Sequence, residues 1–324
     1  MKAISRRRFG QSAAAFAATV TAPHVLRAEQ PLRMIVVVPP GASMDSIVRI
    51  VADKLPAILG RSVVVEYRVG GTGLVAANFM KSTSPDGSHV LFAPISTVAF
   101  FPFLYSQLSY DPDRDLAPVC EGAVSPNAIC VNKTVPASNL KEYIEAVRRD
   151  PALGSIGTSS LGSVGAFLIH LMRKTTGADL RLVGYRGGQP LLTDLIGNHI
   201  PAGQSVLSDY LESHRSGLVK VLGVSTEKRS ALAADLPTFK EQGFAELYGQ
   251  TTMGFFVRGG TGSDTVNRYS KAISDALAMP DVTKKLAALG LEATGSSPES
   301  FAATIASERK RWEPVAREAG VKLD

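Results

Sequence analysis

The chain has 324 residues, of which 45% are hydrophobic and 20% charged, so it has enough apolar side chains for two domains of ordinary size. The formal net charge of +6 excludes little, because residues 1–28 hold five basic residues and no acidic ones. The remaining residues include 30 of the 35 basic residues and all 29 acidic ones. This part of the chain is nearly neutral and contains no run of basic residues, so nothing in its charge indicates nucleic-acid binding.

Residues 1–28 have the pattern of an export signal. The basic sequence SRRRF (residues 5–9) precedes a short alanine-rich segment, and an arginine pair with phenylalanine two places on is the twin-arginine form. This segment is too short for a membrane span, and no later one is long and apolar enough. We therefore expect a signal peptide over residues 1–28, export by the twin-arginine route and a mature protein in the periplasm. The alternative is a disordered basic N-terminus of a cytoplasmic protein.

The segment from Met34 to Ala52 predicts a buried strand, a turn and a helix in succession. The strand is an apolar, β-branched run ended by the sequence PPG (residues 39–41), and Ser43 or Asp45 can cap the following helix. Such a turn presents backbone N–H groups at the carboxyl edge of a sheet, where small anions bind in α/β proteins. We predict an anion-binding turn at residues 41–45.

Strands and helices continue to alternate up to residue 97, which predicts a parallel α/β domain with right-handed crossovers. We expect strands at 62–67 and 90–93, a helix at 74–82 and a loop at 94–97. The pattern Gly71-x-Gly73-x-x-Ala76 resembles a dinucleotide fingerprint, but Asp86, which would have to hold the ribose, lies in a Pro-Asp-Gly turn. No cofactor is therefore expected.

The rest of the chain repeats this organisation and ends in helices. The sequence GTSSLGS (residues 157–163) places glycine and serine between a strand and a helix, which predicts a second anion-binding turn at 159–163. For either turn alone the alternative is an ordinary capped helix; together they indicate two lobes that share a cleft. We expect strands at 127–131, 155–158, 180–185, 219–224 and 253–257, and helices at 140–149, 164–175, 190–196, 264–278, 281–289 and 298–319.

No catalytic or metal-binding constellation is visible in the sequence. The five histidines lack metal-like spacing and are interpreted as structural, and G-x-S-x-G and H-E-x-x-H motifs are absent. We interpret Cys120 and Cys130 as buried thiols, with a disulfide as the alternative in an oxidising compartment. Arg186, at a strand end, could bind a carboxylate or could pin the hinge between the lobes through an ion pair. The pattern favours a binding protein over an enzyme.

The sequence resembles the Bug-type solute receptors of tripartite tricarboxylate transporters. The resemblance covers most of residues 33–320 and implies a type II periplasmic-binding-protein fold, in which two α/β lobes close on a ligand. We expect lobe 1 at residues 29–122 plus 253–324 and lobe 2 at residues 123–252. The matching segments are PPGASMD, SVVVEYRVGGTG, SPDGSHVLF, LSYDPDRDLAPV, GTSSLGS, YRGGQPLLTDLIG, LGVSTEKRS, LPTFKEQGF and SPESFAATIASERKRW.

Family ligands are mostly small carboxylates, so the resemblance also implies a ligand site. It carries over to two turns and two flanking corners: Gly41, Ala42, Ser43 and Asp45; Thr158, Ser159, Gly162 and Ser163; Ser96 and Thr97; and Tyr185, Arg186 and Gly187. Several positions depart from the family pattern: Ala42 replaces a second glycine, Tyr67-Arg68-Val69-Gly70 replaces Asn-Arg-Pro-Gly, and Ala166 replaces a histidine. The departures suggest an unusual ligand, aromatic or monoanionic.

The sequence therefore predicts an exported solute-binding protein that captures a small carboxylate for uptake by a tripartite tricarboxylate-type transporter. Its partners would be the ligand and the membrane subunits of that transporter, and the mature protein would be a monomer without cofactor or metal. One alternative is an exported oxidoreductase with a nucleotide cofactor, which a bound flavin or nicotinamide in the purified protein would reveal. Another is a ligand receptor that signals to a sensor partner.

Overall fold

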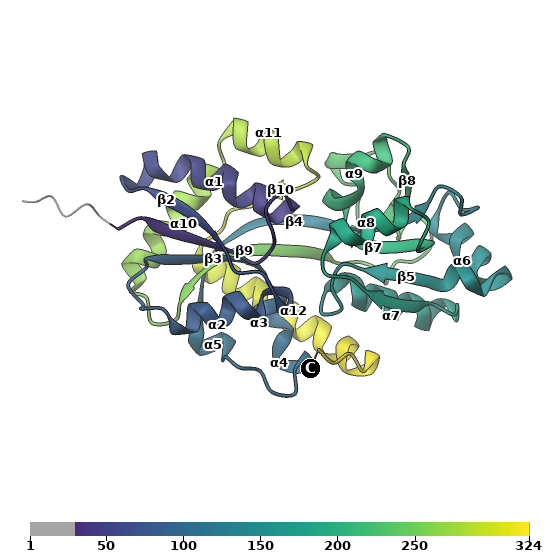
Figure 1. The fold of residues 1–324 in the computed structure, drawn as a ribbon, viewed down its shortest axis with the longest axis horizontal. Helices are drawn as coiled ribbons and strands as arrows, with labels where there is room; N and C mark the ends of the chain where they lie inside the picture. Colours follow the sequence, from purple (N-terminus) through teal and green to yellow (C-terminus); the bar gives the residue numbers. More distant parts are fainter. Residues whose placement is uncertain (1–29, 324) are drawn as a thin grey trace, which may run out of the picture.

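The structure is a computed structural model and describes residues 30–323, so the predicted export signal lies outside the described residues. Ten strands form one continuous mixed sheet in the order β2-β1-β3-β9-β4-β7-β5-β6, with β8 and β10 also paired to β4. Helices cover both faces of the sheet (Figure 1). The predicted α/β class is confirmed.

Lobe 1 is built on β1, β2, β3, β9 and the first part of β4. The predicted parallel unit is confirmed, because β1 pairs in parallel with both β2 and β3. The predicted loop at 94–97 is wrong, since Pro94 ends β3 and residue 96 begins a short buried helix. The elements are β1 (Leu32–Val36), α1 (Ser43–Leu59), β2 (Val63–Tyr67), η1 (Gly71–Gly73), α2 (Leu74–Ser82), β3 (His89–Pro94), α3 (Ser96–Ala99), α4 (Phe101–Leu104) and α5 (Pro112–Asp115).

The long strand β4 (Leu116–Asn132) runs through both lobes (Figure 1). The sequence predicted only its second part, because Pro118, Gly122 and Pro126 interrupt the apolar pattern of the first. The first part of β4 pairs in antiparallel fashion with β9 (Gln250–Arg258), and this pairing contains two register shifts. From Asn127 onward β4 pairs instead with β7 and β8. The change of partner therefore falls between Pro126 and Asn127.

Lobe 2 is built on β5 to β8 and the second part of β4. Strand β5 is parallel to both β6 and β7, so three carboxyl strand ends lie at one edge. Strand β7 and helix α9 were not predicted. The elements are α6 (Leu140–Arg149), η2 (Pro151–Gly154), β5 (Ser155–Thr158), α7 (Val164–Thr176), β6 (Arg181–Gly184), α8 (Gly188–Ile196), β7 (Ala202–Val206), α9 (Leu207–Arg215), β8 (Val219–Val224) and η3 (Ala231–Ala233).

The C-terminal helices return to lobe 1, and the last one also reaches lobe 2. These are α10 (Ser263–Leu277), α11 (Pro280–Ala288), a two-residue strand β10 (Glu292–Ala293) and α12 (Pro298–Ala319). Helix α12 packs on α7, where the rings of Trp312 and Phe167 lie 5.8 Å apart. Cys120 and Cys130 are buried free thiols in separate hydrophobic clusters, as the first interpretation predicted. In residues 30–323 no helix has the length and apolarity to cross a membrane.

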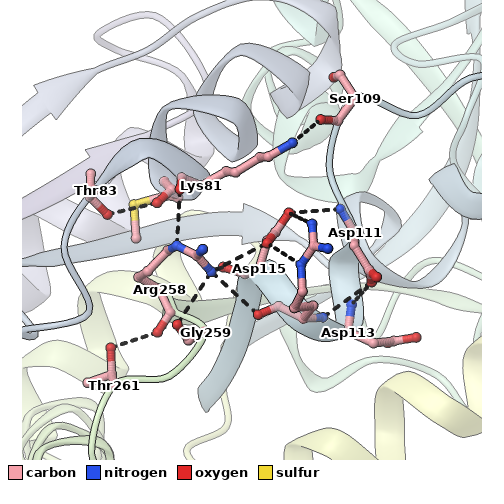
Figure 2. A network of polar contacts seen from close by, with 11 residues as sticks. Lys81, Thr83, Ser109, Asp111, Asp113, Asp115, Arg258, Gly259 and Thr261 are labelled. Carbon is pink, nitrogen blue, oxygen red and sulfur yellow. Dashed lines mark hydrogen bonds and ion pairs between the residues drawn. The ribbon is translucent and has the colours of Figure 1, made fainter.

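An ion-pair network fixes the segment YDPDRDL between α2 and β9 (Figure 2). Asp115 is fully buried; its carboxylate accepts bonds from Arg114 Nε (3.0 Å) and Asp111 N (2.9 Å) and pairs with Arg258. The bond from Arg114 holds the pKa of Asp115 below its usual value. Arg258 Nε in turn donates to the carbonyl of Lys81 (3.1 Å). These acidic residues of the family-like motif thus have a structural role.

Candidate functional site

The predicted site residues come from both lobes, at the carboxyl ends of β1 and β3 in lobe 1 and of β5 and β6 in lobe 2. One side-chain hydrogen bond joins the first of these groups to an unpredicted residue of lobe 2: Ser43 Oγ, at the start of α1, donates to Asp209 Oδ1 of α9 at 3.3 Å. These residues are 166 positions apart in the chain. The lobes therefore meet at the turn where the sequence predicted an anion.

The first turn, between β1 and α1, is held by its own carboxylate. Gly41 has φ of +87°, which favours glycine, and its N–H donates to Asp45 Oδ2 at 2.8 Å. The N-cap residue of α1 is Ala42, whose side chain makes no capping bond, so the prediction of Ser43 or Asp45 as the N-cap is wrong. Asp45 instead reaches back from the first helical turn. The N–H of Gly41 is thus already engaged by the chain.

Asp45 is 2% exposed and its charge is compensated within lobe 1. Its carboxylate accepts bonds from Tyr67 Oη at 2.7 Å and from Arg49 Nε at 3.0 and 3.1 Å, and Arg49 also bonds to Tyr67. Burial raises the pKa of Asp45, but the bonds from Gly41, Tyr67 and Arg49 outweigh it and hold the pKa below its usual value. Tyr67 is therefore part of the support of this turn.

The second turn, between β5 and α7, is held by hydroxyls and backbone groups. Thr158 Oγ1 donates to Gln204 Oε1 at 2.9 Å, and the N–H of Ser159 donates to the Gln204 carbonyl at 3.3 Å. Ser163 is the N-cap of α7: its Oγ accepts from Ala166 N at 3.3 Å and donates to the Ser160 carbonyl at 2.7 Å. The helix cap that the sequence analysis gave as the alternative is present, the predicted anion site stays a prediction, and residues 157–166 contain no acidic side chain.

The corner at Tyr185–Gly187 lies directly beside the second turn. Its backbone N–H groups donate to that turn, Tyr185 N to the Thr158 carbonyl (2.8 Å) and Gly187 N to the Ser159 carbonyl (3.1 Å). Tyr185 Oη donates to Asp194 Oδ2 at 2.7 Å, and burial together with this bond raises the pKa of Tyr185 to about 12. Arg186 is exposed and forms no ion pair within residues 30–323, so of its two expected roles the hinge ion pair is not formed there.

Three other predicted site residues are closely packed. Thr97 and Ser96 are buried, and Thr97 Oγ1 donates to the Pro94 carbonyl at 2.8 Å. A Cβ on Gly73 would lie 2.7 Å from the Thr97 methyl. Gly73, one of the glycines in the pattern that resembles a dinucleotide fingerprint, is therefore explained by close packing against Thr97. A Cβ on Gly162 would lie 2.7 Å from Leu323 and 3.1 Å from Leu104, which places the second turn against lobe 1.

Sequence reasoning missed Asp209, Ser205, Gln204 and Tyr67. Asp209 Oδ2 accepts a hydrogen bond from Ser205 Oγ. Burial raises the pKa of Asp209 by more than the hydrogen bonds from Ser205 and Ser43 lower it. For Asp209, the only signal in the sequence was a polar run after the unpredicted strand β7.

Two surface hollows, of about 450 and 430 Å³, lie beside α10 and α11, and no predicted site residue lines them. No cluster of metal ligands occurs among the residues that the structure describes.

Comparison with known proteins gives consistent matches over nearly the whole chain. The model of the tripartite tricarboxylate transporter family receptors matches residues 47–321. BugT of Bordetella pertussis is 29% identical over 295 residues, which cover 91% of this chain and 90% of BugT. A solved R. palustris protein with adipate has a TM-score of 0.85 at 28% identity, covering 90% of this chain and 98% of its own. The periplasmic binding protein BugD has a TM-score of 0.83 at 25% identity, covering 91% and 99%.

Proposed function

The chain belongs to the receptor family of the tripartite tricarboxylate transporters, and from this premise we propose that it captures a small carboxylate between its lobes and presents it to transporter subunits in the membrane. The predicted Bug-type family and periplasmic-binding-protein fold are confirmed. The chain is a solute-binding receptor. The similar R. palustris protein with adipate supports a carboxylate as the ligand.

One observation carries the proposal in this chain: the carboxyl ends of β1 and of β5 to β7 meet across the lobes at the contact of Ser43 with Asp209. In open α/β sheets, ligands bind outside the carboxyl ends of strands. We assign the ligand's carboxylate to the second turn, Thr158–Ser163, where a helix begins and no acidic side chain is present. The first turn would face the ligand's other end.

The proposal includes the two lobes predicted at residues 29–122 plus 253–324 and 123–252, with residues 123–126 of β4 and 250–252 of β9 moved to lobe 1, because these two stretches pair with each other. Ligand entry requires the contact of Ser43 with Asp209 to open, and the change of β4 partners between Pro126 and Asn127 marks where the connection would bend. We place the mature protein in the periplasm as a monomer, exported by the twin-arginine route. Transport by presentation to membrane subunits needs no catalytic step.

A thermal-shift screen of small carboxylates tests the function. A ligand at 100 times its Kd should raise the free energy of unfolding by about 2.7 kcal/mol. The hit is then measured by isothermal titration calorimetry. Absence of stabilisation by every carboxylate would reject the proposal, and stabilisation by a flavin or nicotinamide would then favour an oxidoreductase.

Replacement of Ser163 tests the placement of the carboxylate. Ser163→Asp and Ser163→Asn both keep a good N-cap for α7, but only Asp adds a negative charge. We expect Ser163→Asp to weaken binding at least about 10-fold more than Ser163→Asn, since it repels the carboxylate and removes charge-assisted bonds. Equal affinities of the two variants would move the carboxylate site elsewhere.

A further inference from the structure

Asp209 is a partly buried carboxylate at the contact between the lobes. It lies in the first turn of α9, where Oδ1 accepts from Ser43 of lobe 1 and Oδ2 from Ser205 at the end of β7. The start of α8 closes over it, because a Cβ on Gly188 would lie 2.0 Å from Asp209 Oδ2. The carboxylate is therefore enclosed by elements of both lobes.

The charge of Asp209 is not compensated by a cation of the described chain. Asp45 and Asp115, which are also buried, each pair with arginine. Among residues 30–323 the partners of its carboxylate are the two hydroxyls, and Arg186, two residues before Gly188, forms no ion pair with it. An enclosed carboxylate without a cation is costly, and burial accordingly raises its pKa. A partner with a positive charge would remove this cost.

We propose that Asp209 selects the ligand by binding an ammonium group, so that the receptor takes small amino-carboxylates in preference to dicarboxylates. The inference rests on the proposed function and names the ligand class of the same site. The ligand's carboxylate lies at the acid-free turn Thr158–Ser163. Its ammonium group lies at Asp209, in the place that the Ser43 hydroxyl takes in this structure.

Specificity follows from the same arrangement. A dicarboxylate would bring its second negative charge against Asp209, beside a first turn that already holds Asp45. Like charges enclosed together repel, whereas an ammonium group forms charge-assisted hydrogen bonds with Asp209. The two turns thus have complementary preferences, one for each end of a zwitterion.

Calorimetry on the full mature protein with matched acids tests this inference. The probes are succinate, glutarate and adipate against 4-aminobutyrate, 5-aminopentanoate and 6-aminohexanoate. We expect the best amino acid to bind wild-type protein at least 10-fold more tightly than the best dicarboxylate. Asp209→Asn should reduce this preference at least 10-fold. Asp235→Asn, which removes an exposed carboxylate elsewhere in lobe 2, should leave the preference unchanged.

The outcomes separate the inference from the function it rests on. A wild-type protein that binds dicarboxylates as tightly as amino acids overturns the inference and leaves the receptor function standing; this comparison needs no variant. Asp209→Asn that changes both affinities by one factor also overturns it, because Asp209 would then only hold the lobes together. Binding of none of these acids, nor of any in the carboxylate screen, overturns the proposed function itself.

Discussion

The first and second turns look alike in the sequence but are stabilised differently. Each follows a parallel strand with glycine and serine and then begins a helix of at least thirteen residues. The first turn depends on a carboxylate, Asp45, with Arg49 and Tyr67 around it. The second depends on the uncharged groups of Thr158, Gln204 and Ser163.

This difference underlies the ligand site that we propose. In the first turn, the N–H of Gly41 and the hydroxyl of Ser43 already donate to carboxylates of the chain. In the second, the helix dipole of α7 acts without an acidic side chain nearby in the sequence. Two similar helix starts therefore differ in the donors that they leave available: those of the first are engaged by carboxylates of the chain, and the second has no acidic side chain beside it.

The largest expected effect is that of Asp45→Ala on stability. The change leaves the N–H of Gly41 and the Tyr67 hydroxyl without their partner, and we expect the free energy of unfolding to fall by about 2–3 kcal/mol. Arg49 is about half exposed and adds little. Urea denaturation measures the loss. Asp53→Ala, an exposed position on the same helix, is the control and should change stability by less than about 0.5 kcal/mol.

Thr158→Val is the corresponding change in the second turn. It keeps the shape but removes the donor to Gln204 Oε1, which is buried, so a loss of about 1–2 kcal/mol is expected in the same assay. The control is Thr193→Val at an exposed position of α8, expected within about 0.5 kcal/mol of wild type. A loss equal to that of Asp45→Ala would remove the distinction between the two turns.

Helix capping should reveal a smaller and opposite pair of effects. Ser163→Ala removes the N-cap of α7 and should cost about 1 kcal/mol, whereas Ser163→Asn should retain most of the stability. Ala42→Ser supplies a hydroxyl to α1, whose N-cap has none, and should raise stability by up to about 1 kcal/mol. A loss on Ala42→Ser would show that Asp45 already satisfies this helix start.

The last expected difference is in pH dependence. The pKa of Asp45 is lower in the folded chain than the usual value of about 3.9, so its contribution is complete above that value and is lost as pH falls through the folded pKa. The loss caused by Asp45→Ala should therefore be constant between about pH 5 and 8 and shrink below about pH 4. The loss caused by Thr158→Val should not follow pH. Denaturation series at several pH values compare the two.

Much of the fold was predictable because its elements have strong local patterns. The β-branched run at 62–67 and the amphipathic helix α12, predicted at Pro298–Ala319 and found there, are examples. Strand β7 was missed because its sequence AGQSV has buried polar side chains, Gln204 and Ser205, where apolar ones signal a strand. Their partners, Thr158 and Asp209, are supplied by other elements.

The candidate site was less predictable than the fold. Local sequence indicated both turns, since glycine and serine before a helix are local features. It could not show that Asp45 turns back to Gly41, or that Tyr67 comes from the neighbouring strand to hold it. Asp209 reaches Ser43 only through the tertiary arrangement of the lobes. Charge at the site is therefore set by long-range contacts.

The continuous strand β4 has a mechanical consequence. This 17-residue strand pairs with β9 and β10 in lobe 1 and with β7 and β8 in lobe 2. A force that pulls the lobes apart therefore acts along the strand. A load in that direction shears many ladder hydrogen bonds at once instead of opening them one by one. The lobes are thus joined by a strand that resists being pulled apart along its length, because its ladders in both lobes would have to shear together.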